Sequence, residues 1–110
     1  MTLSELNTLL STVTVGQTAL PVAYLAFPAD QAPEMPFIVF QETGSDNFGA
    51  DNIVWHSNTR IQVDLLTRNK DRTTEEALET VLANAGIFWE RVSVYENDEA
   101  CYRVTYEFEI

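Results

Sequence analysis

The spacing of apolar residues predicts two amphipathic helices. Leucines recur at helical intervals near the N-terminus, behind a capping box in which Thr2 is followed three residues later by Glu5. A second apolar stripe follows a similar pair, Thr73 and Glu76, and Gly86 stands where a left-handed C-cap ends a helix. We therefore expect a short N-terminal helix and a second helix that opens near Thr73.

Runs rich in β-branched and aromatic residues predict the strands of a sheet. The first run lacks alternation of apolar and polar residues, which suits a strand covered on both faces or lying in an oligomer interface. The segment Thr43–Asn52, rich in Gly, Asn and Asp, is expected to be a loop. The expected strands are Val22–Phe27, Phe37–Glu42, Thr59–Thr67 with Val54 and Trp55 as a hairpin extension, Ile87–Tyr95 and Cys101–Ile110.

The order of these elements indicates the fold class. No alternation of strand and helix with a glycine-rich turn occurs along the sequence, and the last two strands are joined by a short acidic turn. The sequence thus predicts a single α+β domain over residues 1–110, with a mostly antiparallel β-sheet and two helices packed on it.

Composition narrows the classes of function. A chain of 110 residues suffices for one domain with one core. Its 17 acidic and 6 basic side chains give a formal net charge of −11, which excludes nucleic-acid binding through a basic face and argues against binding to anionic membranes. One cysteine and one histidine exclude a disulfide framework and multi-histidine metal centres. The sequence shows no targeting segment or membrane span, so we expect a protein made in a reducing cytoplasm.

Paired carboxylates are the most frequent candidates for chemistry. Acids next to each other could act as general acid and base, but acids in a first helical turn also suit the helix dipole, and acids on a strand often face solvent. We interpret all of them as surface groups. They are Glu75 with Glu76, Asp98 with Glu99, and Glu107 with Glu109.

Two other arrangements are weaker. The segment from Asp46 departs from a calcium loop, because Phe48 and Ser57 occupy its third and twelfth positions. A thiol–imidazole pair would require the fold to bring His56 and Cys101 together, and nothing in the sequence indicates this. We predict no catalytic, metal-binding or cofactor-binding residue.

Apolar residues in unusual places are more informative. Phe48 stands in a polar segment, Trp55 lies near a strand end, and Leu66 lies on the outward register of its strand. Each either packs onto its own domain or anchors a contact with another subunit. Phe48, Trp55 and Leu66 are therefore our candidate interface residues.

The order of these segments resembles small neck proteins of long-tailed bacteriophages and prophages, the tail-terminator and head–tail joining group. The resemblance spans nearly the whole chain, although no motif in it is diagnostic alone. The segments that carry it are Pro21–Tyr24, Pro36–Phe40, Ser45–Asn52, Arg60–Thr67, Gly86–Glu90 and Tyr102–Glu109, after a short N-terminal helix.

The resemblance implies a virion structural protein with an α+β fold and no catalytic residues. Such terminators form a homo-oligomeric, hexameric ring that caps the tail tube protein and meets the head connector or stopper protein. Six copies would carry a formal charge of −66, six times that of one chain. An acidic lumen would let DNA pass without sticking and without sequence-specific binding, whereas solubility alone would also account for the acidity.

Three alternatives remain open at the level of sequence. A head-side connector of the neck has a similar size. An acidic inhibitor or DNA mimic would concentrate its negative charge on one face and bind a basic partner, but the acids here are scattered along the chain. A small enzyme or ligand-binding domain would need a deep pocket with convergent polar groups.

Overall fold

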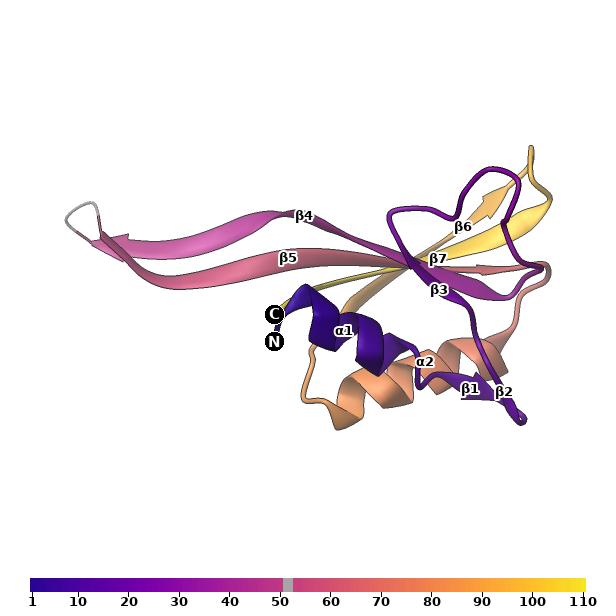
Figure 1. The fold of residues 1–110 in the computed structure, drawn as a ribbon, viewed down its shortest axis with the longest axis horizontal. Coiled ribbons are helices and arrows are strands. Elements are labelled where there is room, and N and C mark those ends of the chain that lie inside the picture. Colours follow the sequence, from indigo (N-terminus) through magenta and orange to yellow (C-terminus); the bar gives the residue numbers. More distant parts are fainter. Residues whose placement is uncertain (51–52) are drawn as a thin grey trace.

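The computed structural model describes the backbone of residues 1–50 and 53–110 and the side chains of residues 1–45 and 58–110. Two helices lie together on one side of a sheet, and the N- and C-termini lie close to each other (Figure 1). The elements are α1 (Leu3–Leu10), β1 (Thr14–Val15), β2 (Thr18–Ala19), β3 (Val22–Tyr24), β4 (Phe37–Ala50), β5 (Ile53–Thr67), α2 (Arg72–Asn84), β6 (Glu90–Glu96) and β7 (Cys101–Glu109).

The main sheet has the strand order β3-β4-β5-β7-β6. Only β3 and β4 are parallel, and every other neighbouring pair is antiparallel. The strands β1 and β2 form a separate small hairpin, turning at Gly16 with a φ of 64°. The predicted α+β class with a mostly antiparallel sheet and two helices is thus confirmed.

Local signals account for both helices. At α1, Thr2 accepts a hydrogen bond from the Glu5 amide and the Glu5 carboxylate accepts one from the Thr2 amide, as the capping box predicts. The start of α2 differs from the prediction, because Asp71 is its N-cap and accepts a hydrogen bond from the Thr74 amide. The helix ends as expected before Gly86, whose φ is 75°.

The core lies between the helices and one face of the sheet. Leu6 of α1 and Leu78 of α2 are fully buried in this core. Alternate residues of β5 and β7 face them. The main core residues are Leu6, Leu10, Val13, Leu20, Ile38, Phe40, Ile61, Val63, Leu65, Leu78, Leu82, Val104, Tyr106 and Phe108.

The segment Thr43–Asn52, predicted as a loop, belongs mainly to β4. Pairing between β4 and β5 continues from the sheet out to Ala50 opposite Ile53, with register shifts after Glu42 and after Phe48. Cross-strand pairing therefore overrides the low strand propensity of Gly, Asn and Asp in this segment. A glycine stands at each of the two register shifts, where the regular ladder of hydrogen bonds is interrupted.

The end of this hairpin forms an arm, which we define as residues 43–50 of β4 and 53–59 of β5. β3 pairs with β4 only as far as Phe40, and β7 pairs with β5 only as far as Arg60, with Ile110 bonded to Thr59 just beyond it. Past these points the two strands pair only with each other. The arm projects from the body along the longest dimension of the molecule, whose extents are 49 × 29 × 24 Å (Figure 1).

Candidate functional site

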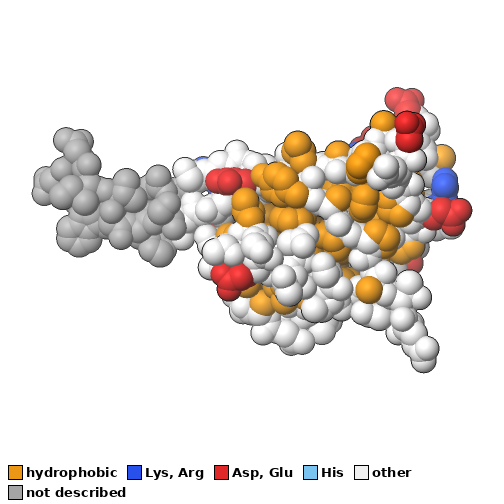
Figure 2. Space-filling model, in the orientation of Figure 1, with side chains coloured by type: hydrophobic (Ala, Val, Ile, Leu, Met, Phe, Trp, Pro, Cys, Tyr) orange, Lys and Arg blue, Asp and Glu red, His pale blue; other side chains and the backbone are white. Residues whose placement is uncertain are grey.

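Large apolar side chains that remain exposed gather at the two edges of the main sheet. Apart from Met1, they lie either at the end of β3 or in and just before β6. Figure 2 shows apolar side chains gathered over the body, whereas the acidic ones on the face that it shows are scattered. The exposed apolar residues at the edges are Tyr24, Leu25, Phe88, Val92, Val94 and Tyr95.

One edge is β6, which pairs with β7 alone. Its residues are exposed, except that Glu96 is half-buried. Val92 and Val94 lie on the face of the sheet away from the helices, with exposed fractions of 61% and 47%, and Phe88 just before the strand is 84% exposed. Proteins usually protect such an edge with charge, proline or a bulge, and none of these interrupts the middle of β6.

The opposite edge is formed by β3 and, beyond it, by β4. Leu25 follows the last residue of β3 in a left-handed conformation with a φ of 71°, and its amide donates to the Phe40 carbonyl. The Tyr24 ring packs edge-on against Phe40, and the Glu42 amide points at the Tyr24 hydroxyl at 3.4 Å. Past this point the outer side of β4 has no neighbouring strand in the described part of the chain.

A cluster of ions joins β6 to α2. Arg91 Nη1 lies 2.7 Å from Glu79 Oε2, and the Tyr106 hydroxyl donates to the same oxygen at 2.8 Å. Burial opposes ionisation of Glu79, but the hydrogen bonds from Tyr106 and Arg91 outweigh it and lower its pKa. Burial, and secondly this hydrogen bond, raises the pKa of Tyr106, so the phenol stays protonated.

The interpretation of Glu75 and Glu76 as surface groups is wrong for Glu75. Its side chain is 1% exposed, with Arg72 Nη1 at 2.7 Å and Lys70 Nζ at 3.0 Å from its two oxygens. Glu76 beside it is exposed, as expected. Because Glu75 is buried in the first turn of α2 and paired with two cations, its environment is that of a structural ion cluster.

A second polar cluster lies on the other face of the sheet, around the buried Asp64. Its carboxylate accepts hydrogen bonds from the Thr105 hydroxyl at 2.7 Å, from Gln62 at 3.1 Å and from Arg103 at 3.2 Å. Arg103 also contacts Glu96 at 3.1 Å. These contacts satisfy Asp64 and tie β5 to β7, so the cluster is a structural feature of the sheet.

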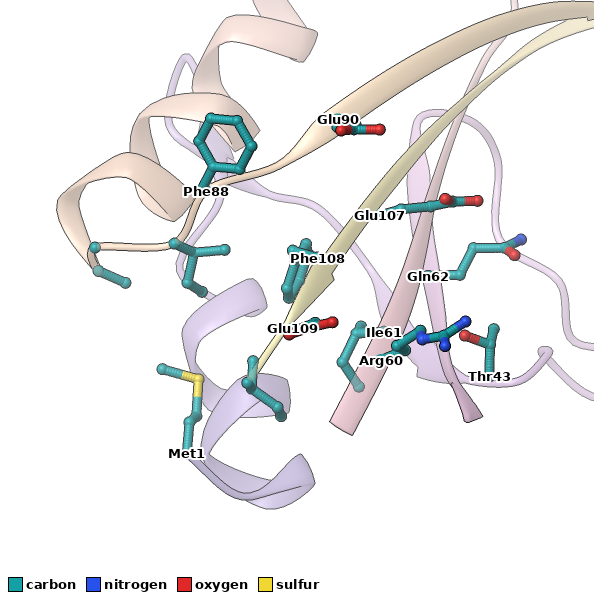
Figure 3. A pocket seen from close by; sticks show the side chains of 14 residues that line it. Met1, Thr43, Arg60, Ile61, Gln62, Phe88, Glu90, Glu107, Phe108 and Glu109 are labelled. Atoms are coloured by element: carbon teal, nitrogen blue, oxygen red, sulfur yellow. The ribbon is translucent and has the colours of Figure 1, made fainter. Parts of the chain in front are cut away.

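An open groove of about 680 Å³ lies at the end of β7, beside the last turn of α2 (Figure 3). Exposed carboxylates from neighbouring strands line it. In the register, Glu90 of β6 is opposite Glu107 of β7, and Glu109 of β7 is opposite the cation Arg60 of β5. The described side chains here include no buried base or nucleophile. The carboxylates along the groove are exposed to solvent.

The predicted interface residues have different outcomes. The side chains of Phe48 and Trp55 lie outside the described residues, although their backbones belong to β4 and β5. Leu66 does lie on the face away from the helices, beside Phe37 and Arg103 in the register. It is only 4% exposed, so its side chain is already covered within its own chain and gives no support to a contact role.

The thiol–imidazole pair is excluded by the backbone. Cys101 is buried at the start of β7. The next residue, Tyr102, pairs with Thr67 at one end of β5. His56 lies eleven residues away along β5, which corresponds to about 36 Å. Burial, and secondly the neighbouring Glu99, raises the pKa of the Cys101 thiol, which disfavours the reactive thiolate.

The described residues offer no support for a metal site or a membrane-spanning helix. The calcium segment from Asp46 lies outside the described side chains. Elsewhere in the described residues, no group of three or more His, Cys, Asp or Glu side chains is placed to hold a metal ion. No helix in the described chain is long and apolar enough to cross a membrane.

The spacing of residues did not predict the exposed edge at β6, although it held a signal for the opposite edge. The poor alternation of Val22–Phe27 indicated a strand either covered on both faces or lying in an oligomer interface, and Tyr24 and Leu25 are exposed there. In β6, Val92 and Val94 look like inward residues of an ordinary strand. Only the sheet order, which places β6 last, reveals that they are exposed.

Comparison with known proteins adds no family to this description. Protein-family models give no match to the chain, and the curated proteins give no significant match.

Proposed function

We propose that this chain is a virion structural protein, a ring-forming tail terminator that caps the phage tail tube and joins it to the head connector. The proposal takes its starting point from the resemblance described above. Its homo-oligomer is a hexameric ring, and its partners are the tail tube protein and the head connector or stopper protein. The protein is assembled in the bacterial host cytoplasm and resides in the tail neck of the virion.

The observation that carries the proposal is the arm. A two-stranded hairpin is marginally stable in water unless another surface supports it. Beyond Phe40 on one strand and Thr59 on the other, the two strands of the arm pair only with each other in the described part of the chain. A hairpin that extends beyond its own core in this way is typical of a protein that reaches a neighbouring subunit, which would supply the supporting surface.

The charge is compatible with this role. A ring of six chains has a formal charge of −66, which keeps DNA from adhering to it during passage. The same repulsion opposes ring closure, so assembly is expected to strengthen with salt. On the face shown in Figure 2, the scattered acids do not form the concentrated surface that a DNA mimic requires.

The test is electron microscopy of a phage lysate whose gene for this protein carries an early stop codon. Overlong tails beside filled, unattached heads are expected for a tail terminator. Tails of normal length beside leaking or unattached heads would assign the protein to the head side of the joint. Intact, infectious particles would refute a neck role and favour the acidic inhibitor.

Complementation with an arm-shortened variant makes this test specific. Ser45 and Thr59 face each other in the register, so an Asn-Gly turn can join them and replace residues 46–58. The core residues of the described part of the chain all lie outside the deleted segment, so this variant is expected to fold. It should fail to restore tail length where the wild type succeeds. Normal tails with this variant would show that the arm is dispensable.

A further inference from the structure

The outer side of β6 is an open row of main-chain hydrogen-bonding groups. In an antiparallel pair, about every second residue of a strand turns its N–H and C=O away from its partner. Within the described residues, β7 is the only neighbour of β6, and no main-chain group of residues 90–96 bonds to any other element. The register with β7 runs without a shift over all seven residues, about 24 Å of strand. The edge therefore has the regular geometry that a further strand can extend.

The side chains of β6 form a symmetrical pattern on the face of the sheet away from the helices. Glu90 and Glu96 lie at the two ends of the strand, and the exposed Val92 and Val94 lie between them. Side chains on one face of a sheet interact with their cross-strand neighbours. The two bare valines therefore favour an added strand with apolar side chains at the matching positions, and the acids favour basic side chains at its ends.

The acid at the start of β6 has an unfavourable neighbour. Glu90 is directly opposite Glu107 of β7, and the two side chains extend to the same side of the sheet (Figure 3). Both are exposed, and neither has an ion pair within the described residues. Like charges directly opposite each other destabilise a sheet. A lysine or arginine brought beside Glu90 by an added strand would relieve this repulsion, whereas Glu96 already contacts Arg103.

The same charges disfavour a second copy at this edge. Two β6 strands paired antiparallel over their full length place Glu90 of each copy opposite Glu96 of the other. Parallel pairing in register places each of these acids opposite itself. Acid therefore faces acid in both arrangements. Each copy also carries a formal net charge of −11, which opposes their approach. A basic segment of a different protein avoids both penalties.

We propose that the outer edge of β6 binds an extended, basic segment of another protein, which joins the main sheet as an additional strand. The segment runs antiparallel to β6, as β6 itself does to β7. It places apolar side chains beside Val92 and Val94 and a lysine or arginine beside Glu90. This inference goes beyond the tail-terminator role and does not depend on it.

A synthetic peptide of the sequence Lys-Thr-Val-Thr-Val-Thr-Lys, capped at both ends, is the probe. Its valines match Val92 and Val94, and its lysines match Glu90 and Glu96. A second peptide with glutamate in place of both lysines is the charge control. Each peptide is titrated into the full-length protein up to about 1 mM, and NMR spectra of the backbone amides report where and how tightly it binds.

Binding should be confined to the edge and should depend on charge. The lysine peptide should shift the amides of β6 and bind at least about tenfold more tightly than the glutamate peptide, because attraction at both ends becomes repulsion. Val92→Lys should weaken binding of the lysine peptide at least about tenfold, since lysine in the middle of an edge hinders strand pairing. Thr80→Lys adds the same charge at an exposed position of α2 and should keep the wild-type affinity. Circular dichroism and thermal unfolding establish that both variants fold.

A charge reversal at one end tests the direction of the added strand. In an antiparallel complex, Glu90 faces the last residue of the peptide and Glu96 faces the first. The variant Glu90→Lys should therefore prefer a peptide with lysine first and glutamate last over the peptide with these two residues exchanged. The opposite preference would contradict the antiparallel contact.

Three further results would overturn the proposal. Unchanged amides of β6 at about 1 mM lysine peptide would show that the edge does not accept such a strand. Equal affinities for the lysine and glutamate peptides would show that its acids do not select a basic partner. A protein that dimerises without peptide in sedimentation velocity, and no longer does so as Val92→Lys, would show that a second copy occupies the edge.

Discussion

The two neighbours of β7 differ in what covers them. On one side, β5 lies under the apolar side chains of both helices, and Val104 and Tyr106 of β7 are fully buried with it. On the other side, β6 makes polar contacts: Arg91 pairs with Glu79 of α2, and Ser93 accepts a hydrogen bond from Lys70, which lies just before that helix. Valine at alternate positions therefore builds the core in one strand and a bare surface in the next. The hydrophobic pattern specifies a strand, whereas its place in the sheet decides what the strand does.

The largest difference is expected for truncation in the core. Leu78 is fully buried on α2, so Leu78→Ala should lower the free energy of unfolding by about 2–5 kcal/mol. Val92→Ala on the exposed edge should change it by no more than about 0.5 kcal/mol. Urea denaturation of the monomeric protein measures both. Equal losses at the two positions would mean that β6 is part of the core.

One substitution made in both strands sharpens the comparison. Val104→Thr places a hydroxyl in the core and should cost about 1–3 kcal/mol if it finds no partner. Val92→Thr makes the same change at a solvent-exposed position and should be nearly neutral, within about 0.5 kcal/mol. The pair keeps side-chain shape constant, so only burial differs. A costly Val92→Thr in the monomer would contradict an exposed β6.

Tyrosine hydroxyls allow a finer test. The Tyr106 hydroxyl is buried and donates to Glu79, so Tyr106→Phe should cost about 1 kcal/mol in the free energy of unfolding. The Tyr24 hydroxyl lies at the exposed edge, 3.4 Å from the Glu42 amide, so Tyr24→Phe should cost less than about 0.5 kcal/mol. Thermal unfolding of both variants at one pH gives the comparison. A larger loss for Tyr24→Phe would reverse it.

The sequence predicts the buried part of the fold better than its edges. Local capping signals predict both helices. The start of α2 differs, because the Asp71 carboxylate, three residues before Thr74, accepts hydrogen bonds from the amide and the hydroxyl of Thr74 and so caps the helix in place of Thr73. Alternation places β5 and β7, since their inward residues meet the helices. The strand structure of the β4–β5 hairpin depends on pairing with residues elsewhere in the chain, which composition does not show. The segment rich in Gly and Asn is therefore predicted as a loop although it is part of a strand.

The candidate surfaces follow the same rule. Burial of Leu66 and exposure of Val92 depend on which strands flank them, and neither residue type nor spacing contains that information. The ion pairs of Glu75 likewise depend on how the chain turns into α2, which brings Lys70 of the preceding loop and Arg72 of the first turn onto one carboxylate. Sequence alone leaves Glu75 indistinguishable from the exposed Glu76.

The last and smallest effect concerns the polar joint between the two regions, where Glu79 binds Arg91 of β6 and Tyr106 of β7. The pKa of Glu79 in the folded protein lies below its ordinary value of 4.5, so the unfolded chain binds a proton more readily. The contribution of Glu79 to stability is therefore present above about pH 4.5 and is lost as the pH falls through the lower, folded pKa. Stability measured from pH 7 to 3 should fall less steeply in Glu79→Gln than in wild type. Glu90→Gln, at an exposed position of β6, removes one carboxylate without touching the joint and is the matched control for the loss of charge. An unchanged slope in Glu79→Gln would mean that the joint holds β6 by packing, without the charge of this carboxylate.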